Sequence, residues 1–220
     1  MNLEKIYNEL EKLHIMESEK EQYNDILKEI KTEILCNGKI KTGIISSFKK
    51  ATNMNKNWNK YKENILRNKD GHYVCSNGYF AIEWNNFEDI PKELQSYVNE
   101  EIEPVDLIFD KLTGGLENTS KEIDIKKVKQ IYKLNKLHKK DNKALLLNFN
   151  DVLLDTNLII LILGILGKDK EEKISMIYDK TQLNAPIRIV TENYRVMLLP
   201  IRYSEERIKQ NSELENEWLN

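Results

Sequence analysis

Side chains that could carry out catalysis are few in this sequence, and they are not grouped. The three histidines, His14, His72 and His138, are far apart and lack the spacing of metal ligands. We find no Walker-type phosphate loop, no nucleophile elbow and no dinucleotide-binding fingerprint. The sequence therefore predicts a protein that is not an enzyme.

Two further motifs allow both a functional and a structural interpretation. Thr113-Gly114-Gly115 is too short for a phosphate-binding loop and is typical of a surface turn. Four acidic residues that are close in sequence could hold a cation or could form a solvated acidic surface: Glu100, Glu101, Glu103 and Asp106. We expect neither a metal nor a cofactor.

Positive charge is concentrated in two stretches, and the one that also carries aromatic residues suits contact with phosphate. Residues 39–69 hold nine Lys or Arg against the single acid Glu63, with Trp58 and Tyr61 between them. Residues 121–143 hold nine lysines against Glu122, Asp124 and Asp141. Lys and Arg displace condensed counterions from nucleic acid, so the first stretch is a candidate DNA-binding region. The candidate residues are Lys49, Lys50, Lys56, Lys60 and Lys62.

Negative charge is concentrated between these stretches. Residues 83–110 hold nine acids against Lys92 alone. One interpretation is a solvated surface on which the acidic and basic segments balance each other. The other is an acidic surface that imitates the charge of nucleic acid and binds a partner protein.

Composition limits the class of protein. A chain of 220 residues can bury one good domain with an appendage, and its net charge of −2 gives no overall field that attracts nucleic acid. Cys36 and Cys75 lack CxxC spacing and are expected to be reduced. The N-terminus has no signal-peptide pattern, and the longest uncharged apolar run, residues 157–166, is about half a membrane span. We expect a soluble, cytoplasmic protein without membrane contact. The sequence is rich in Lys, Asn and Ile, which indicates a bacterial or phage genome.

Residues 2–35 are predicted to be helical. Two apolar stripes at helical spacing support this: Leu3, Ile6, Leu10 and Leu13, then Tyr23, Leu27, Ile30 and Ile34. Ser18 and Glu21 form a capping box between the stripes, which favours a helical hairpin over one long helix. This arm, residues 1–36, either binds a partner or a second copy of the chain, or covers the domain that follows.

The same order of elements is predicted twice in the rest of the chain. After the Asn37-Gly38 turn come a short strand at 39–41, a helix from Gly43 to about Asn53, and strands near 64–67, 72–75 and 79–84. Near the C-terminus come a strand at 145–147, a helix at 156–166, and strands at 173–178, 185–190 and 194–203. Between the two runs we expect a short helix after Pro91, a strand at 106–109 and a helix at 124–138.

Three motifs in the second run carry a resemblance to a known family. They are Asn148-Phe149-Asn150 before an apolar helix, Ala185 to Ile189 in a strand, and Tyr194 to Arg202 at the end. Together they resemble the C-terminal part of bacterial DNA sliding clamps, the beta subunit of DNA polymerase III. In the first run, Ser76-Asn77-Gly78 resembles a turn of the same family. The last motif departs from the family by having Leu198 and Leu199 before the proline and Ile201 in place of a methionine.

The resemblance implies an α+β fold, a DNA-clamp-like domain of two βαβββ half-units. We place this domain at 37–203, with half-units at about 37–86 and 144–203, an insertion at 87–143 and a charged tail at 204–220. The family binds peptides of its partners through the last strand. The matching residues here are Leu199, Pro200, Ile201 and Arg202.

One feature separates this chain from a working clamp. Clamp helices present basic residues to DNA, whereas the helix at 156–166 is uncharged and must be covered. We expect the N-terminal hairpin or a partner protein to cover it. One domain of this kind would also form a ring around double-stranded DNA only as a homo-oligomer.

Three functions remain open from the sequence. The first is a non-catalytic, clamp-like protein in DNA replication or processing that contacts polymerase-type peptides and DNA. The second is a phage-type inhibitor that blocks a host nuclease or defence complex, in the manner of an anti-CRISPR protein. The third is a structural protein that dimerises through its N-terminal arm.

Overall fold

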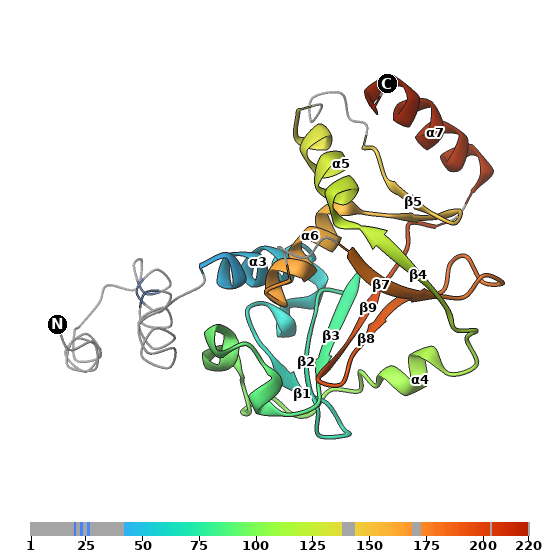
Figure 1. Cartoon of the computed structure of the whole chain (residues 1–220). Helices are drawn as coiled ribbons and strands as arrows, with labels where there is room; N and C mark the ends of the chain where they lie inside the picture. The colour runs from blue at the N-terminus through green and yellow to red at the C-terminus, as the bar shows by residue number, and fades with distance from the viewer. Residues whose placement is uncertain are drawn as a thin grey trace.

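The fold is built on one sheet of seven strands, and its longer helices lie on one side of the sheet (Figure 1). The structure is a computed structural model that describes residues 42–137, 144–168, 173–202 and 204–219, and also Lys20, Tyr23 and Ile26. The predicted α+β class is confirmed. Apart from those three residues, the helical arm predicted for 1–36 lies outside the described residues, as does the strand expected at 39–41.

The strands follow the order β1-β2-β3-β9-β8-β7-β4, and each neighbouring pair is antiparallel. Their side chains alternate between the faces of the sheet, so Phe80, Ile82 and Trp84 belong to the same buried cluster as residues of the helices. The strands are β1 Leu66–Arg67, β2 Tyr73–Ser76, β3 Phe80–Trp84, β4 Thr119–Asp124, β7 Lys173–Tyr178, β8 Ile187–Val190 and β9 Tyr194–Leu198.

Two units with the same order of elements meet in the middle of this sheet. Helix α3 (Thr42–Thr52) precedes β1, β2 and β3, and helix α6 (Thr156–Ile165) precedes β7, β8 and β9. The units join through β3 and β9, where Ile82 lies opposite Val196. Because the order of strands in one unit reverses that in the other, the units are related by an approximate two-fold axis. The repeated order of a helix and three strands, predicted from the sequence, is present in both.

Helices α3 and α6 pack closely because small residues lie at their contact. A side-chain carbon added at Gly164 of α6 would lie 2.8 Å from Cβ of Ser47 in α3, closer than real contacts allow. At the other end of the pair, the Asn157 amide nitrogen is 4.0 Å from the Met54 sulfur. The two helices therefore run antiparallel.

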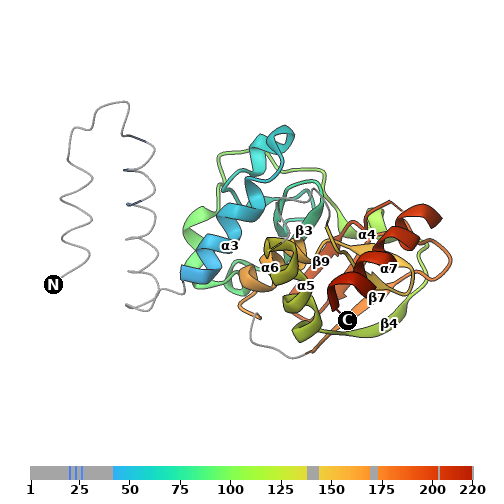
Figure 2. The same cartoon turned by 90° about the horizontal axis from the view of Figure 1, so that it is seen from above.

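Helix α6 is covered within the chain. It contacts α3 on one side and α5 (Ile125–Leu137) on the other, and β7, β8 and β9 lie beneath it. Figure 2 shows the helices in the order α3, α6, α5 and α7. The expectation that the N-terminal hairpin or a partner protein must cover this helix is therefore corrected: the inserted helix α5 buries Val128 and Ile131 and supplies much of the cover.

The rest of the insertion departs from its prediction at two points. It contains the 3-10 helices η3 (Phe87–Asp89) and η4 (Lys92–Tyr97), followed by α4 (Phe109–Thr113), β4 and α5. The strand expected at 106–109 is wrong, because Phe109 starts α4 and packs on Ala81 and Met197 across the sheet. Strand β4 has no counterpart among the predicted strands, since only Ile123 of its six residues is buried.

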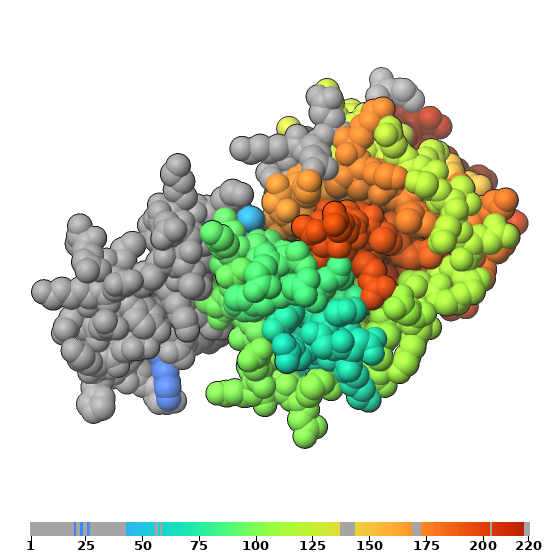
Figure 3. Space-filling view, turned by 60° about the horizontal axis from the view of Figure 1, so that its bottom comes forward, coloured from blue at the N-terminus to red at the C-terminus, as the bar shows by residue number. Residues whose placement is uncertain are grey.

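Residues 105–118 cross the face of the sheet opposite the helices, and two arginines hold them there. Arg195 of β9 pairs with Asp110 at 2.6 Å, and Arg188 of β8 donates to the Glu117 carbonyl oxygen at 2.8 Å. In Figure 3 the orange-red surface of β8 and β9 lies beside the yellow-green surface of this crossing segment. The segment therefore ties the centre of the sheet to its β4 edge.

A separate hairpin connects the insertion to α6. It consists of β5 (Leu147–Phe149) and β6 (Val152–Leu154), joined by Asn150 and Asp151, which have positive φ angles of 51° and 63°. Only one strand was predicted here. Beyond β9 the charged tail is helical, forming α7 (Glu205–Leu219).

Candidate functional site

The residues predicted to bind peptides lie directly after β9, and they are Leu199, Pro200, Ile201 and Arg202. The Leu199 N–H donates to the Tyr79 carbonyl oxygen at 2.8 Å, and the Ile201 N–H donates to the Leu153 carbonyl oxygen at 2.8 Å. Leu199 is 43% exposed, Pro200 and Ile201 are half-buried, and Arg202 is exposed. The segment therefore runs from the sheet to the β5–β6 hairpin with its backbone held and its apolar side chains partly open to solvent.

Tyr79 lies beside Leu199 and is 50% exposed. Its position is set by the fully buried Asn77, whose amide nitrogen donates to the Ala51 carbonyl oxygen of α3 at 2.9 Å. The Asn77 side-chain oxygen accepts the Tyr79 N–H at 2.9 Å. The Asn77-Gly78 turn was predicted, but the sequence did not place Tyr79 beside Leu199, because that depends on the pairing of β3 with β9.

The five lysines predicted to contact DNA lie on α3 and around the 3-10 helix η2 (Lys56–Tyr61). The Lys49 amine is 3.9 Å from the Glu63 carboxylate, the one acid of this basic stretch. The Lys60 amine lies 5.2 Å from the centre of the Tyr61 ring. Lys50, Lys60 and Lys62 are exposed, and the Lys56 side chain lies outside the described part of the structure. The set is a loose group at the C-terminal end of α3, and Lys49 in it is paired with Glu63.

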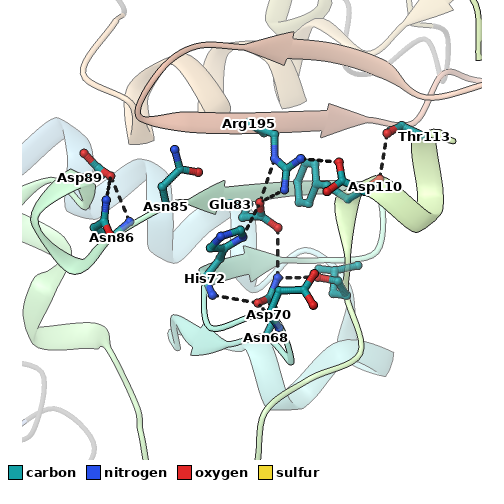
Figure 4. Close-up of polar contacts among 12 residues, drawn as sticks. Asn68, Asp70, His72, Glu83, Asn85, Asn86, Asp89, Asp110, Thr113 and Arg195 are labelled. Atoms are coloured by element: carbon teal, nitrogen blue, oxygen red, sulfur yellow. Dashed lines mark hydrogen bonds and ion pairs between the residues drawn. The ribbon is translucent and has the colours of Figure 1, made fainter.

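A buried polar cluster centred on Glu83 lies on the face of the sheet opposite helices α3, α5 and α6 (Figure 4). Glu83 is fully buried; its Oε2 accepts from the Asn68 amide at 3.1 Å, and its Oε1 accepts from Arg195 Nε at 2.9 Å and also from Arg195 Nη2. His72 Nδ1 lies 3.1 Å from the same Oε1. Arg195 Nη1 pairs in turn with Asp110 at 2.6 Å. A buried carboxylate needs this degree of pairing to be tolerated.

The environment of Arg195 favours its charged form. Burial alone would lower the pKa of Arg195, but the hydrogen bonds and charges of Glu83 and Asp110 raise that pKa above its ordinary value. The guanidinium carbon also lies 5.4 Å from the centre of the Phe109 ring. The ion pairs of Arg195 with Glu83 and Asp110 hold β3, β9 and the segment that carries Asp110 together.

The sequence analysis missed this cluster, although a signal was present. Glu83 and Arg195 are charged residues within two predicted strands that are otherwise mainly apolar, and they lie directly opposite each other in the sheet. A charge in a buried strand needs a partner of opposite sign, so each of the two charges indicates that a partner exists. The sequence did not identify the partner, because that requires knowing that β3 and β9 are neighbours.

The acidic segment does not form one continuous negative surface. Glu83 and Glu93 are buried. Lys111 and Lys69 lie 3.4 Å from the Asp106 carboxylate and hold the pKa of Asp106 below its usual range, Lys111 through the leading hydrogen bond. Several of the nine acids are therefore withdrawn from solvent or neutralised within the chain.

The described residues offer little else that could do chemistry. Within them, no group of three or more His, Cys, Asp or Glu is placed to hold a metal ion. Cys75 is a buried free thiol, and burial raises its pKa. His14, His138 and Cys36 lie outside the described residues. In the same part of the chain, no helix combines the length and apolar character needed to cross a membrane.

Comparison with known proteins gives similarity of structure only. No protein-family model matches the chain, and no curated protein matches it either. The fold resembles that of a putative DNA polymerase III beta subunit from Eubacterium rectale ATCC 33656, with 14% sequence identity and a TM-score of 0.45. That match covers 74% of this chain and 64% of the other.

A second similar structure is the DNA polymerase III beta subunit from Thermotoga maritima. The identity is 11% and the TM-score is 0.39, over 60% of this chain and 55% of the other. The chain thus spans less than two thirds of the length of either protein. Both structures are described as DNA polymerase III beta subunits, the family that the sequence motifs resemble.

Proposed function

We propose that this chain is a non-catalytic, sliding-clamp-like protein that acts in DNA replication or processing by binding peptide segments of other proteins. The observation that carries the proposal is the exposed pair of Leu199, directly after β9, and Tyr79, directly before β3, at 43% and 50% exposure. Leu199 belongs to the segment whose sequence resembles the peptide-binding strand of sliding clamps.

The geometry of the segment suits a peptide with apolar side chains. The backbone N–H groups of Leu199 and Ile201 already donate to the carbonyl oxygens of Tyr79 and Leu153, so the segment is ordered before a partner arrives. Leucine and isoleucine keep the surface apolar but adapt their shape less than methionine does. We therefore expect a narrower range of peptide partners than a methionine-rich surface would accept.

The test is binding of a fluorescently labelled, polymerase-type clamp-binding peptide, followed by fluorescence anisotropy. Leu199→Asp should weaken binding at least about tenfold, which corresponds to about 1.4 kcal/mol. Val190→Asp is the matched control, because Val190 is also an exposed apolar residue, at 54%, but lies on β8. Equal affinity of the wild type and Leu199→Asp, or no binding by the wild type, would contradict the proposal.

Contact with DNA is the second part of the proposal, and the exposed lysines Lys50, Lys60 and Lys62 support it through their charge. The alternative function, inhibition of a host nuclease or defence complex by charge imitation, finds less support because Glu83 and Glu93 are buried. Dimerisation through the N-terminal arm involves residues outside the described part of the chain.

A further inference from the structure

The inserted helix α5 is the most strongly basic helix of the described structure. Its thirteen residues contain five lysines and no Asp or Glu. Four of them recur at intervals of three and four residues and so line one ridge of the helix. These are Lys126, Lys129, Lys133 and Lys136, of which Lys129 is partly exposed and the others are exposed.

The direction of this lysine ridge is fixed by what lies behind it. Ile125, Val128 and Ile131 on the opposite side of α5 are fully buried or within 1% of it. The helix follows β4 without a loop, and the Asp124 carboxylate accepts the Lys126 N–H at 2.7 Å. At the other end, the Asn135 side chain exchanges two hydrogen bonds of 2.8 Å with the Leu145 backbone. The ridge is therefore held on a rigid support.

The fifth lysine of α5, Lys127, is not part of the ridge and pairs with α7. The Lys127 amine is 2.7 Å from the Glu215 carboxylate of α7, so Lys127 joins the two helices. The exposed residues of α7 carry charges of both signs: Glu205, Glu206, Glu213 and Glu217, and also Arg207 and Lys209. The lysine ridge, which has no acid on its own helix, is therefore the more uniformly positive of the two surfaces.

The chemistry of the ridge indicates a double-stranded polyanion. Like charges three and four residues apart repel each other on a helix, and a row of phosphates relieves that repulsion. Among the residues of α5 whose side chains the structure describes, the exposed ones are Lys and Gln130, with no exposed apolar residue that would insert into a membrane. The aromatic residue Tyr132 is half-buried, with the Lys136 amine 4.4 Å from its ring centre, and offers no open stacking platform for single strands.

We propose that the lysine ridge of α5 contacts the phosphate backbone of double-stranded DNA. The choice of DNA as the polyanion rests on the proposed function. The surface differs from the group of Lys49, Lys50, Lys56, Lys60 and Lys62, because the ridge lies on the insertion and on the other side of the uncharged helix α6. Contacts to backbone alone make the binding independent of sequence and strongly dependent on salt.

The test measures affinity for a labelled DNA duplex of mixed sequence across a salt series, using the full chain. One variant carries Lys126→Gln, Lys133→Gln and Lys136→Gln. The control carries Lys92→Gln, Lys180→Gln and Lys209→Gln, three exposed lysines outside both candidate surfaces, and removes the same charge. Four phosphate contacts give a slope of log K against log salt of about −3.6, or about a hundredfold loss from 50 to 200 mM salt. The ridge variant should reduce the size of this slope by about 2.7, and the control by less than about 0.9.

Three results would overturn the inference: loss of binding in the control variant but not in the ridge variant, equal slopes in all proteins, or preference for single strands. Absence of DNA binding by the wild type would also overturn it. Peptide binding through Leu199 is measured separately. A failure to bind DNA would therefore leave the peptide part of the proposed function standing. Circular dichroism of each variant checks that its secondary structure is kept. We expect no change, because none of the replaced side chains is buried.

Discussion

Asn135 of α5 and Asn211 of α7 bind consecutive residues of one extended segment in the same way. Asn135 exchanges two hydrogen bonds of 2.8 Å with the backbone of Leu145. Asn211 accepts the Leu146 N–H at 2.7 Å and donates to the Leu146 carbonyl oxygen at 3.1 Å. Each amide therefore takes the place of a neighbouring strand and attaches a helix to the segment that leads into β5.

Replacing Asn211 by Ala should weaken this attachment. Asn211 is 4% exposed, and its loss leaves the N–H and C=O of Leu146 without these partners. We expect the free energy of unfolding to fall by about 2–3 kcal/mol, because an unpaired buried polar group costs about 1–3 kcal/mol. Urea denaturation measures the change. The control Gln210→Ala, at an exposed position of the same helix, should change it by less than about 0.5 kcal/mol, and equal losses would show that the paired hydrogen bonds contribute nothing.

Replacing Glu83 by Gln should destabilise the sheet, because the change leaves Arg195 and His72 beside an uncharged side chain. Breaking a buried ion pair costs about 3–5 kcal/mol. We expect a value near the lower end, about 3 kcal/mol, since Arg195 keeps Asp110 and its side chain is 22% exposed.

A double-mutant cycle with Arg195→Met tests whether this loss comes from the pair itself. The double variant should lose less stability than the sum of the two single variants, because the two residues are in contact. Strict additivity would disprove the coupling. Glu101→Gln, at an exposed acid of the same segment, serves as the neutral control for charge removal.

Replacing Gly164 by Ala should push α3 and α6 apart. The added methyl group would overlap the Ser47 side chain, so we expect a loss of about 1–3 kcal/mol even though Ala favours a helix by about 1 kcal/mol. Gly43→Ala is the control, because no atom lies within 4 Å of the added carbon, and it should be neutral or stabilising. Adding Ser47→Gly to Gly164→Ala should restore part of the thermal stability, and no recovery would mean that the clash is not the cause.

Acid should weaken the contact between the crossing segment and the β7–β8 connection. The Thr181 hydroxyl, which donates to the Asp179 carboxylate at 2.6 Å, and the N–H groups of Glu117 and Thr181 hold the pKa of Asp179 below its usual value. Because the folded pKa is below the unfolded one, this stabilisation is complete above about pH 4 and is lost as the pH falls through the folded pKa.

The melting temperature between pH 7 and pH 2 measures this effect. Asp179→Asn should lower the melting temperature at pH 7 and make its fall below pH 4 shallower than in the wild type. Asp70→Asn, at an exposed turn position, should follow the wild-type curve. Identical curves for wild type and Asp179→Asn would show that Asp179 does not contribute to acid sensitivity.

Local patterns predicted most of the elements and failed where burial was one-sided or the chain crossed the sheet. The helices α3, α5 and α6 and strands β7, β8 and β9 lie close to their predicted positions, because their apolar residues recur with helix or strand spacing. Strand β4 was not predicted because it forms by pairing with β7, and its own residues are mostly exposed and lack a strand-like apolar pattern. The strand predicted at 106–109 failed because Phe109 packs on the sheet face from outside.

The sequence by itself determined the class of fold, the repeated order of elements and the positions of the charged segments, because each depends on residues that are near neighbours in the chain. The tertiary structure alone decided that α5 covers α6, that Tyr79 lies beside Leu199, and that Glu83 meets Arg195. Those relationships depend on which strands pair, and β3 joins β9 across 112 positions between Glu83 and Arg195. Pairing at that distance is set by how all the apolar faces are buried together, and no short stretch of sequence contains that information.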